Sequence, residues 1–193
     1  MRFKLGPLPE NEDFRPSETG WSRVMDPSPV LLHVLAAPVA IALLVLSFLV
    51  CRAFVGPDEF RLDMVNMTLV YWTIAILIPI HEFVHAISTP SWGMSDRTVV
   101  GFWPRKVLPY AIYTDALTRT QIIWFIVMPF LTLTVLPAIG MCILELDTPI
   151  LYYCILINAG LSGGDIVQVP VFLSQVPRHA IIRNRGFESY WKA

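Results

Sequence analysis

The stretch MVNMTLVYWTIAILIPI, residues 64–80, contains no charged side chain, and it runs directly into HEFVH, residues 81–85. An uninterrupted apolar run of this length predicts a membrane-spanning helix. An ionisable side chain at membrane depth costs about 2.5 to 3.5 kcal/mol on insertion scales. Three such side chains, His81, Glu82 and His85, therefore indicate a function for this end of the helix.

The spacing within HEFVH favours a metal site. Positions i and i+4 of an α-helix share one face, so His81 and His85 can reach the same ion while Glu82 lies beside it. Two neutral histidines leave room for a third protein ligand and a water, whose pKa zinc lowers to about 7. Glu82 is then the base rather than a ligand. A chance HExxH on the solvated face of a soluble helix is the competing interpretation, and the apolar surroundings argue against it.

The composition indicates a membrane protein with several spans. Hydrophobic residues make up 55% of the 193 residues and charged residues 15%, which is below the share in an average soluble domain. Four apolar blocks reach the roughly 20 residues that a spanning helix needs. We therefore expect an all-α polytopic fold with four transmembrane helices, at about residues 30–54, 64–88, 121–145 and 149–174.

Basic residues predict the orientation of these helices. Lysine and arginine number 12 in residues 1–29, 89–120 and 175–193, against 2 in the remaining connections. The positive-inside rule then places both termini in the cytoplasm of an integral, multi-pass protein, which we assign to the plasma (inner) membrane. Residues 1–29 carry nine charges and five prolines and are expected to form an irregular cytoplasmic arm, with 30–174 as the membrane domain and 175–193 as a cytoplasmic tail. The sequence contains no basic stripe, so we do not expect nucleic acid as a partner.

Asp165 is the candidate third ligand because it lies inside the fourth apolar block. At 1.5 Å per residue, its expected depth in that helix agrees with the depth of His81 and His85 in the second helix to within about a turn. Asn158 precedes Asp165 by seven residues and so lies on the same face. Asn158 could hydrogen-bond a substrate carbonyl or the developing oxyanion, or it could bond a neighbouring helix for stability.

Residues 89–120 are too polar and proline-rich to span a membrane. Within them, 98–103 and 107–113 are rich in β-branched and aromatic residues, and Pro104-Arg105-Lys106 predicts a turn, which together indicate a hairpin on the cytoplasmic side. A peptide bond inside a helix is inaccessible to a hydrolase. We expect an edge strand near the metal, at 98–103, to hold an unwound substrate by main-chain pairing, with an interfacial loop that does not contact substrate as the alternative.

The motifs resemble a known family of membrane proteins. HEFVH at 81–85, GFWPRKVLPYAIY at 101–113, MPF at 128–130 and SGGD at 162–165 are similar to the DUF3267-like zincin membrane peptidases, a family related to the site-2 protease group of intramembrane metallopeptidases. The resemblance covers about residues 64–175. It implies His81 and His85 as zinc ligands, Glu82 as base and Asp165 as third ligand. The chain departs from the site-2 pattern because Gly164 rather than Leu precedes Asp165.

The function expected from these observations is an intramembrane zinc metalloprotease. It would hydrolyse peptide bonds of membrane-spanning or signal-peptide-like substrates through a zinc-activated water, with the lipid bilayer and a membrane-anchored peptide as its partners. The alternative is a membrane sensor or scaffold that binds zinc or a peptide without catalysis. Glu82 separates the two, because a structural zinc site is closed by a fourth ligand and has no use for a neighbouring base.

Overall fold

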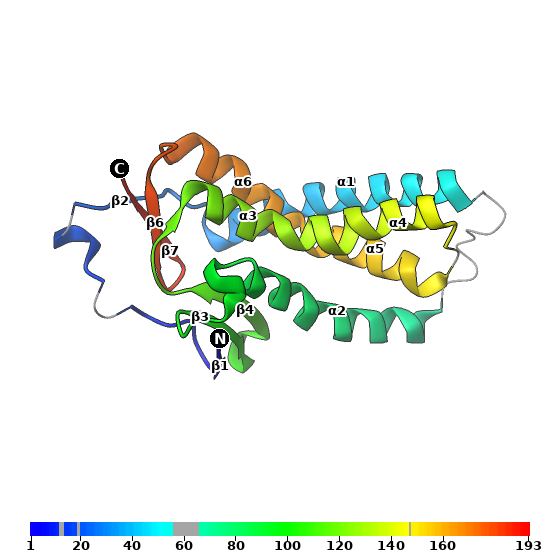
Figure 1. Cartoon of the computed structure of the whole chain (residues 1–193), viewed down its shortest axis with the longest axis horizontal. Coiled ribbons are helices and arrows are strands. Elements are labelled where there is room, and N and C mark those ends of the chain that lie inside the picture. The colour runs from blue at the N-terminus through cyan, green and yellow to red at the C-terminus, as the bar shows by residue number, and fades with distance from the viewer. Residues whose placement is uncertain (12–13, 19, 56–65, 147) are drawn as a thin grey trace.

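The chain folds into an elongated helical bundle with two small β-sheets at one end. The computed structural model describes residues 1–11, 14–18, 20–55, 66–146 and 148–193 (Figure 1). Both chain ends lie beside the sheets, and the C-terminal ends of α1 and α4 lie at the opposite end of the bundle (Figure 1). The helices of the bundle are α1 (Pro29–Val55), α2 (Met67–Ile87), α3 (Arg119–Phe130), α4 (Leu136–Leu144), α5 (Pro149–Leu161) and α6 (Gly163–Gln175).

Three helical segments of the described chain are long and apolar enough to cross a membrane, namely Val30–Phe54, Met67–Ile87 and Arg119–Leu144. The pair α5 and α6 makes a fourth if it counts as one span, since it bends by 42° at Ser162. The expected limits agree with these segments to within a few residues. The second helix begins later than predicted because Asn66 caps it by accepting a hydrogen bond from the Leu69 amide at 3.1 Å; residues 64–65 lie outside the described part.

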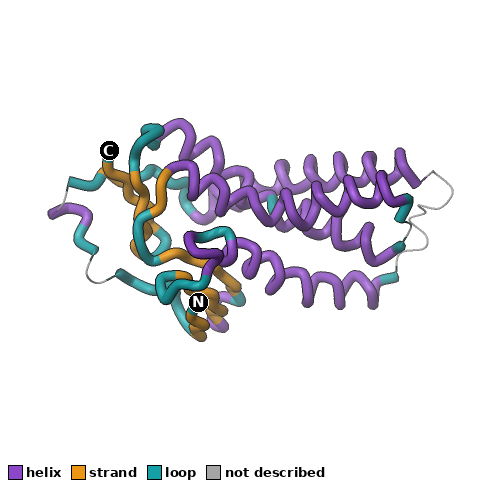
Figure 2. Tube along the Cα trace, in the orientation of Figure 1, coloured by secondary structure: helices purple, strands orange, loops and turns teal. Residues whose placement is uncertain are grey.

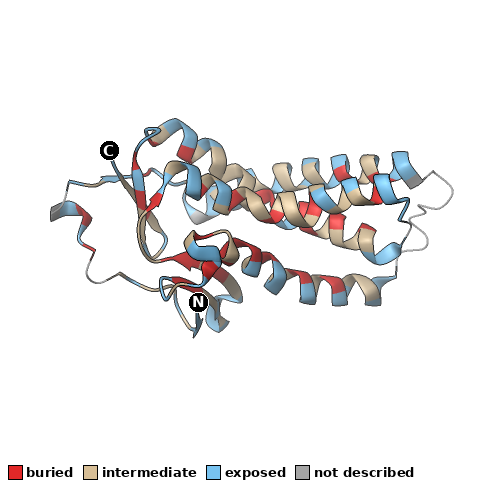
Figure 3. Cartoon of the chain, in the orientation of Figure 1, coloured by how far each residue is buried: buried red, intermediate tan, exposed pale blue. Residues whose placement is uncertain are grey.

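Only a small share of the residues in the spans is buried, and the rest are exposed or intermediate, as expected for helices that contact lipid (Figure 3). Its tightest described glycine contact joins α6 to α1. A Cβ on Gly163 would lie 2.6 Å from the Cβ of Ala40, whereas a Cβ on Gly164 would meet nothing within 4 Å. Glycine at position 163 therefore allows the close approach of the two helices.

The third span is interrupted by a π-helical segment, η5 (Leu131–Val135), between α3 and α4. Pro137 follows it in the first turn of α4 and has no N–H to donate to the preceding turn. Such single turns of π-helix are rare and frequently accompany functional sites. Here the segment contributes a buried hydroxyl, that of Thr134, to the interior of the bundle.

The fold is mostly helical, as predicted, but two sheets form at the end of the bundle, where only a hairpin was expected (Figure 2). The first has the order β1-β3-β4 and the second the order β2-β7-β6-β5. Long-range pairing decided this outcome, since the strands come from the two termini and from the segment between α2 and α3. The strands are β1 (Arg2–Leu5), β2 (Ser22–Arg23), β3 (Thr98–Trp103), β4 (Leu108–Tyr113), β5 (Leu117–Thr118), β6 (Ile181–Arg185) and β7 (Glu188–Lys192).

The predicted hairpin between the second and third spans is present as β3 and β4, which pair in antiparallel register. Its position is fixed at the end of α2, where the buried hydroxyl of Thr89 lies 2.8 Å from that of Thr98 and donates to the Ala86 carbonyl at 2.7 Å. A short 3-10 helix, η4 (Pro104–Lys106), makes the turn between the two strands. The first sheet is thereby held against the last turns of α2.

The N-terminal arm, which was predicted to be irregular, forms two short strands. Its first residues form β1, which pairs in parallel with β3, and β2 pairs with β7. The hydroxyl of Tyr110 donates to the carbonyls of Gly6 and Pro7, both at 3.2 Å, and burial raises the pKa of this hydroxyl, which keeps it a neutral donor. The ring fits because residue 101 is glycine: a Cβ there would lie 2.4 Å from Tyr110.

Candidate metal centre

The last turns of α2 bring His81 and His85 into the interior of the protein. Their exposed fractions are only 6% and 5%, although the opposite face of the same helix is open. The two rings lie edge to face with centroids 4.9 Å apart, as the i and i+4 spacing requires. The helix therefore directs both imidazoles into the bundle, toward α6.

The three predicted ligands come together in space. One oxygen of Asp165, Oδ2, lies 3.0 Å from His81 Nε2 and 3.4 Å from His85 Nε2. The three ligand atoms all lie within 4.8 Å of one another, and they form the group in the described residues that could hold a metal ion. Asp165 stands in the first turn of α6, just after the bend at Ser162, which turns its carboxylate toward α2.

Protein acceptors fix the protonation pattern of both histidines. His85 Nδ1 donates to the main-chain carbonyl of Phe125 at 2.6 Å, and His81 Nδ1 donates to Asn158 Oδ1 at 2.8 Å. A carbonyl oxygen only accepts, so each neutral imidazole carries its proton on Nδ1 and presents the lone pair of Nε2. Two such lone pairs and a carboxylate oxygen then point at one place, an arrangement that a cation stabilises and that is otherwise repulsive.

The buried amide of Asn158 is oriented by the third span. Its Nδ2 donates to the Pro129 carbonyl at 3.0 Å and to Thr134 Oγ1 at 2.9 Å, which fixes the amide with Oδ1 toward His81. The side chain has no exposed surface. Of the two roles expected from the sequence, these contacts favour bonding between helices; the oxyanion role stays a prediction.

Sequence reasoning did not single out Thr134, Ser162 or the Phe125 carbonyl. Ser162 follows Asn158 by one turn, and its hydroxyl donates to the Asn158 carbonyl at 2.9 Å. Ser162 is the first residue of the SGGD motif, so the sequence could have identified it as a residue of the site. By contrast, a main-chain carbonyl carries no signature in the sequence, and Thr134 faces the site only because the π segment and α5 pack together.

The donor set fits zinc. Two imidazole nitrogens and one carboxylate oxygen are common in catalytic zinc sites, where three protein ligands leave one position open. Metal–ligand bonds of about 2.0 to 2.2 Å in a tetrahedron put neighbouring ligand atoms about 3.4 Å apart. The observed separations of 3.0 and 3.4 Å from Asp165 Oδ2 are close to this value. The hydrogen bonds from both Nδ1 atoms are the outer partners that metal-bound histidines require.

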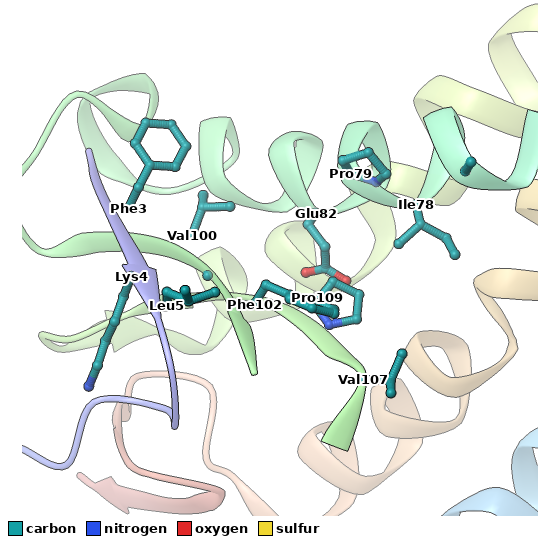
Figure 4. Close-up of a pocket in the computed structure, with 12 residues that line it drawn as sticks. Phe3, Lys4, Leu5, Ile78, Pro79, Glu82, Val100, Phe102, Val107 and Pro109 are labelled. Carbon is teal, nitrogen blue, oxygen red and sulfur yellow. The ribbon is translucent and has the colours of Figure 1, made fainter. Parts of the chain in front are cut away.

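Glu82 lies between two cavities. A cavity of about 250 Å³ contacts Glu82, His85 and Asp165 on one side and β4 on the other. A larger, apolar cavity of about 750 Å³ lies between α2 and the first sheet and has Glu82 among the residues that line it (Figure 4). The carboxylate is therefore placed between the cluster of candidate ligands and space that can receive a second molecule.

The outer edge of β4 faces this site, which corrects the expectation that 98–103 is the edge strand. The Gly6 amide donates to the Phe102 carbonyl at 2.9 Å, so β3 is paired on both sides. Because main-chain groups alternate along a strand, those of Pro109 and Ala111 then point away from β3. The amide of Ala111 lies against the Glu82 carboxylate. The open edge is thus 108–113.

The fold and the site define a multi-pass membrane protein with a candidate metal centre buried between two of its helices. The chain belongs to the DUF3267 family, described as "Putative zincin peptidase", whose model matches residues 74–181. That match covers His81, Glu82, His85, Asn158 and Asp165 and implies zinc as the metal. No curated protein and no solved structure matches the chain.

Proposed function

We propose that the protein is an intramembrane zinc endopeptidase that cleaves membrane-spanning or signal-peptide-like segments, in the manner of the site-2 protease group. The observation that carries the proposal is the convergence of His81 Nε2, His85 Nε2 and Asp165 Oδ2 beside the Glu82 carboxylate. Family membership supports a zinc peptidase. The apolar helices around the centre support a substrate that lies in the bilayer.

Each residue has a part in this proposal. His81, His85 and Asp165 would hold zinc, which would supply a Lewis acid and lower the pKa of a bound water to about 7. Glu82 would serve as general base and then as general acid, taking a proton from the attacking water and returning it to the leaving amine. Asn158 positions His81 and fixes its tautomer, as the Phe125 carbonyl does for His85.

The outer edge of β4 is the proposed binding site for the scissile segment. A substrate that unwinds can donate its main-chain N–H groups to the carbonyls of Pro109 and Ala111, which presents its own carbonyl next to Glu82 and the three ligands. An extended segment is required because the carbonyls of an intact helix are enclosed in their own hydrogen bonds. We further propose that both chain ends face the cytoplasm, on the basis of the 12 to 2 distribution of basic residues.

The proposal is tested with Glu82→Gln, which keeps the size of the side chain and removes the base. We expect the variant to retain zinc, measured as bound metal per chain, and to lose hydrolysis by about 10² to 10⁴ fold. Membrane peptides that accumulate with this variant in cells and are absent from wild-type samples, identified by mass spectrometry, would be the substrates.

Asp165→Ala is the matched control, because it should lose zinc affinity as well as hydrolysis. Hydrolysis that persists in Glu82→Gln would contradict the mechanism, and unchanged zinc in Asp165→Ala would remove Asp165 from the ligand set. Zinc binding by a wild-type protein that cleaves no membrane peptide would favour the sensor or scaffold instead.

A further inference from the structure

The large cavity is bounded on one side by a stripe of α2 that ends at Glu82. Ala75, Ile78 and Glu82 are spaced by three and four residues, so they share one face of the helix, and Pro79 lies beside them. From Ala75 to Glu82 the helix rises about 10 Å, which is the length of about three residues of extended chain. If the scissile peptide bond of a substrate lies at Glu82, the space along this stripe can therefore accept the substrate side chains on one side of that bond.

The opposite wall is one face of the first sheet. Phe3 lies in register with Val100, and Leu5 with Phe102, so these four side chains share a face. Figure 4 shows them around the cavity with Glu82. Phe3 and Leu5 are 79% and 77% exposed, although they are large and apolar, so this wall is uncovered in the protein alone. Apart from Glu82 and Lys4, the side chains that line the cavity carry no charge.

Main-chain groups in the cavity favour a peptide as its occupant over the acyl chain of a lipid. Pro79 has no N–H, so the carbonyl of Ala75 lacks the donor that an α-helix would supply at that position. Pro109, which also lines the cavity, belongs to the open edge of β4. The main chain of Pro109 likewise offers only a carbonyl, because proline has no N–H. An unwound peptide carries N–H groups that can donate to both carbonyls, whereas an acyl chain has no donor.

We propose that this cavity, which we name the apolar cleft (Ala75, Ile78 and Glu82 of α2 with Phe3, Leu5, Val100 and Phe102 of the sheet), is a specificity subsite. It receives large apolar side chains next to the scissile bond of the substrate. Its volume of about 750 Å³ lies in the range of ligand-binding pockets. The inference rests on the proposed function for its substrate class, and it adds the N-terminal strand β1, which lies outside the family match, to the substrate-binding surface.

Binding can be tested apart from hydrolysis by using the Glu82→Gln protein. The probe is a synthetic 20-residue peptide of alternating leucine and alanine, with one photoreactive leucine at its centre. We expect irradiation to cross-link it to residues of the apolar cleft, located by mass spectrometry. Ala75→Trp should fill the cleft and reduce labelling by at least about tenfold; the exposed position of Ala75 allows the larger side chain without disturbing the core.

Two control variants separate the cleft from general effects. Ala42→Trp places the same side chain at an exposed position of α1 and should leave labelling unchanged. Phe3→Ser with Leu5→Ser should weaken labelling, whereas Arg2→Ser, in register with Val99 on the opposite face of the sheet, should not. All variants should retain the zinc content of the parent.

The outcomes distinguish this inference from the proposed function. Labelling of the cleft by a photoreactive phosphatidylcholine in place of the peptide, or equal peptide labelling in Ala75→Trp, would overturn the subsite even if hydrolysis depends on Glu82. Peptide labelling that Ala75→Trp abolishes, in a protein whose wild-type form cleaves nothing, would support the cleft as a peptide site while the proposed hydrolysis fails.

Discussion

His81 and Asn158 show how a candidate metal ligand is oriented by a residue outside the candidate ligand set. The imidazole would be free to rotate and to exchange tautomers if only its position on α2 were fixed. The Asn158 oxygen, 2.8 Å from Nδ1, removes that freedom, and the amide is itself locked by the Pro129 carbonyl and the Thr134 hydroxyl. Three of the bundle's spans therefore determine where one lone pair points.

Replacing Asn158 by alanine should weaken zinc binding. His81 would lose its acceptor, and loss of an outer partner typically lowers metal affinity by about 10 to 100 fold. The measurement is zinc affinity by competition with a chelator in the purified protein. Thr73→Ala is a suitable control, because the buried Thr73 hydroxyl lies on the same helix as His81 and donates to the Leu69 carbonyl of that helix at 2.8 Å. Equal affinity in Asn158→Ala and wild type would refute the positioning role.

At the scale of elements, the bend between α5 and α6 is what turns Asp165 toward α2. The break follows Ser162, and α6 then starts with Gly163 packed against Ala40 of α1. Gly160 and Gly164, at a spacing of four in this span, form the small-residue pattern that often accompanies close packing of helices. Neither makes the tight contact: a Cβ on Gly160 would lie 3.9 Å from Leu44, which is ordinary van der Waals distance.

Gly163→Ala and Gly164→Ala make a matched pair that tests this packing. The first adds a methyl group 2.6 Å from Ala40 Cβ, so α6 must shift, at a cost of about 1 to 3 kcal/mol. The second enters open space in a helix and should be neutral or stabilise by up to about 1 kcal/mol. Thermal unfolding in detergent, followed by circular dichroism, measures both. A larger loss of stability for position 164 would contradict the arrangement of α1 and α6.

At the scale of the whole molecule, the N-terminal arm connects the two sheets. The Asn11 amide donates to the Thr114 carbonyl, at the end of β4, and to the Asn184 carbonyl of β6, at 2.9 and 2.8 Å. Phe14 is buried and lies edge-on against Trp21 and Tyr190. The cavity beside the candidate ligands is thus lined by residues of α2, α3 and α6 and by residues of β4 and of the β6–β7 hairpin.

Metal removal should destabilise the whole protein, because the proposed ligands connect two separate helices. His81 and His85 belong to α2 and Asp165 to α6, so zinc binds the folded state and not the unfolded chain. At zinc concentrations a hundred times the Kd this linkage contributes about 2.7 kcal/mol. We expect a chelator to lower the melting temperature of wild-type protein and to have no effect on Asp165→Ala. An equal shift in both proteins would exclude Asp165 from the linkage.

The sequence by itself determined the features that depend on local spacing. Apolar runs of sufficient length located the spans, and a spacing of four placed His81 and His85 on one helix face. Equal rise per residue in two helices put Asp165 at the right depth, and β-branched residues around Pro104 located the hairpin. Each of these follows from the regular geometry of one helix or one strand, which a linear pattern encodes directly.

Only the tertiary structure decided which groups from distant segments meet. Packing between spans brings the Phe125 carbonyl to His85 and the Thr134 hydroxyl to Asn158. No regular spacing in the sequence predicts these two contacts. The pairing of β1 with β3 covered the expected edge strand and left β4 open, because a strand takes whichever neighbour satisfies its main-chain groups. Such contacts join residues far apart in the chain, so the sequence near each partner does not specify them.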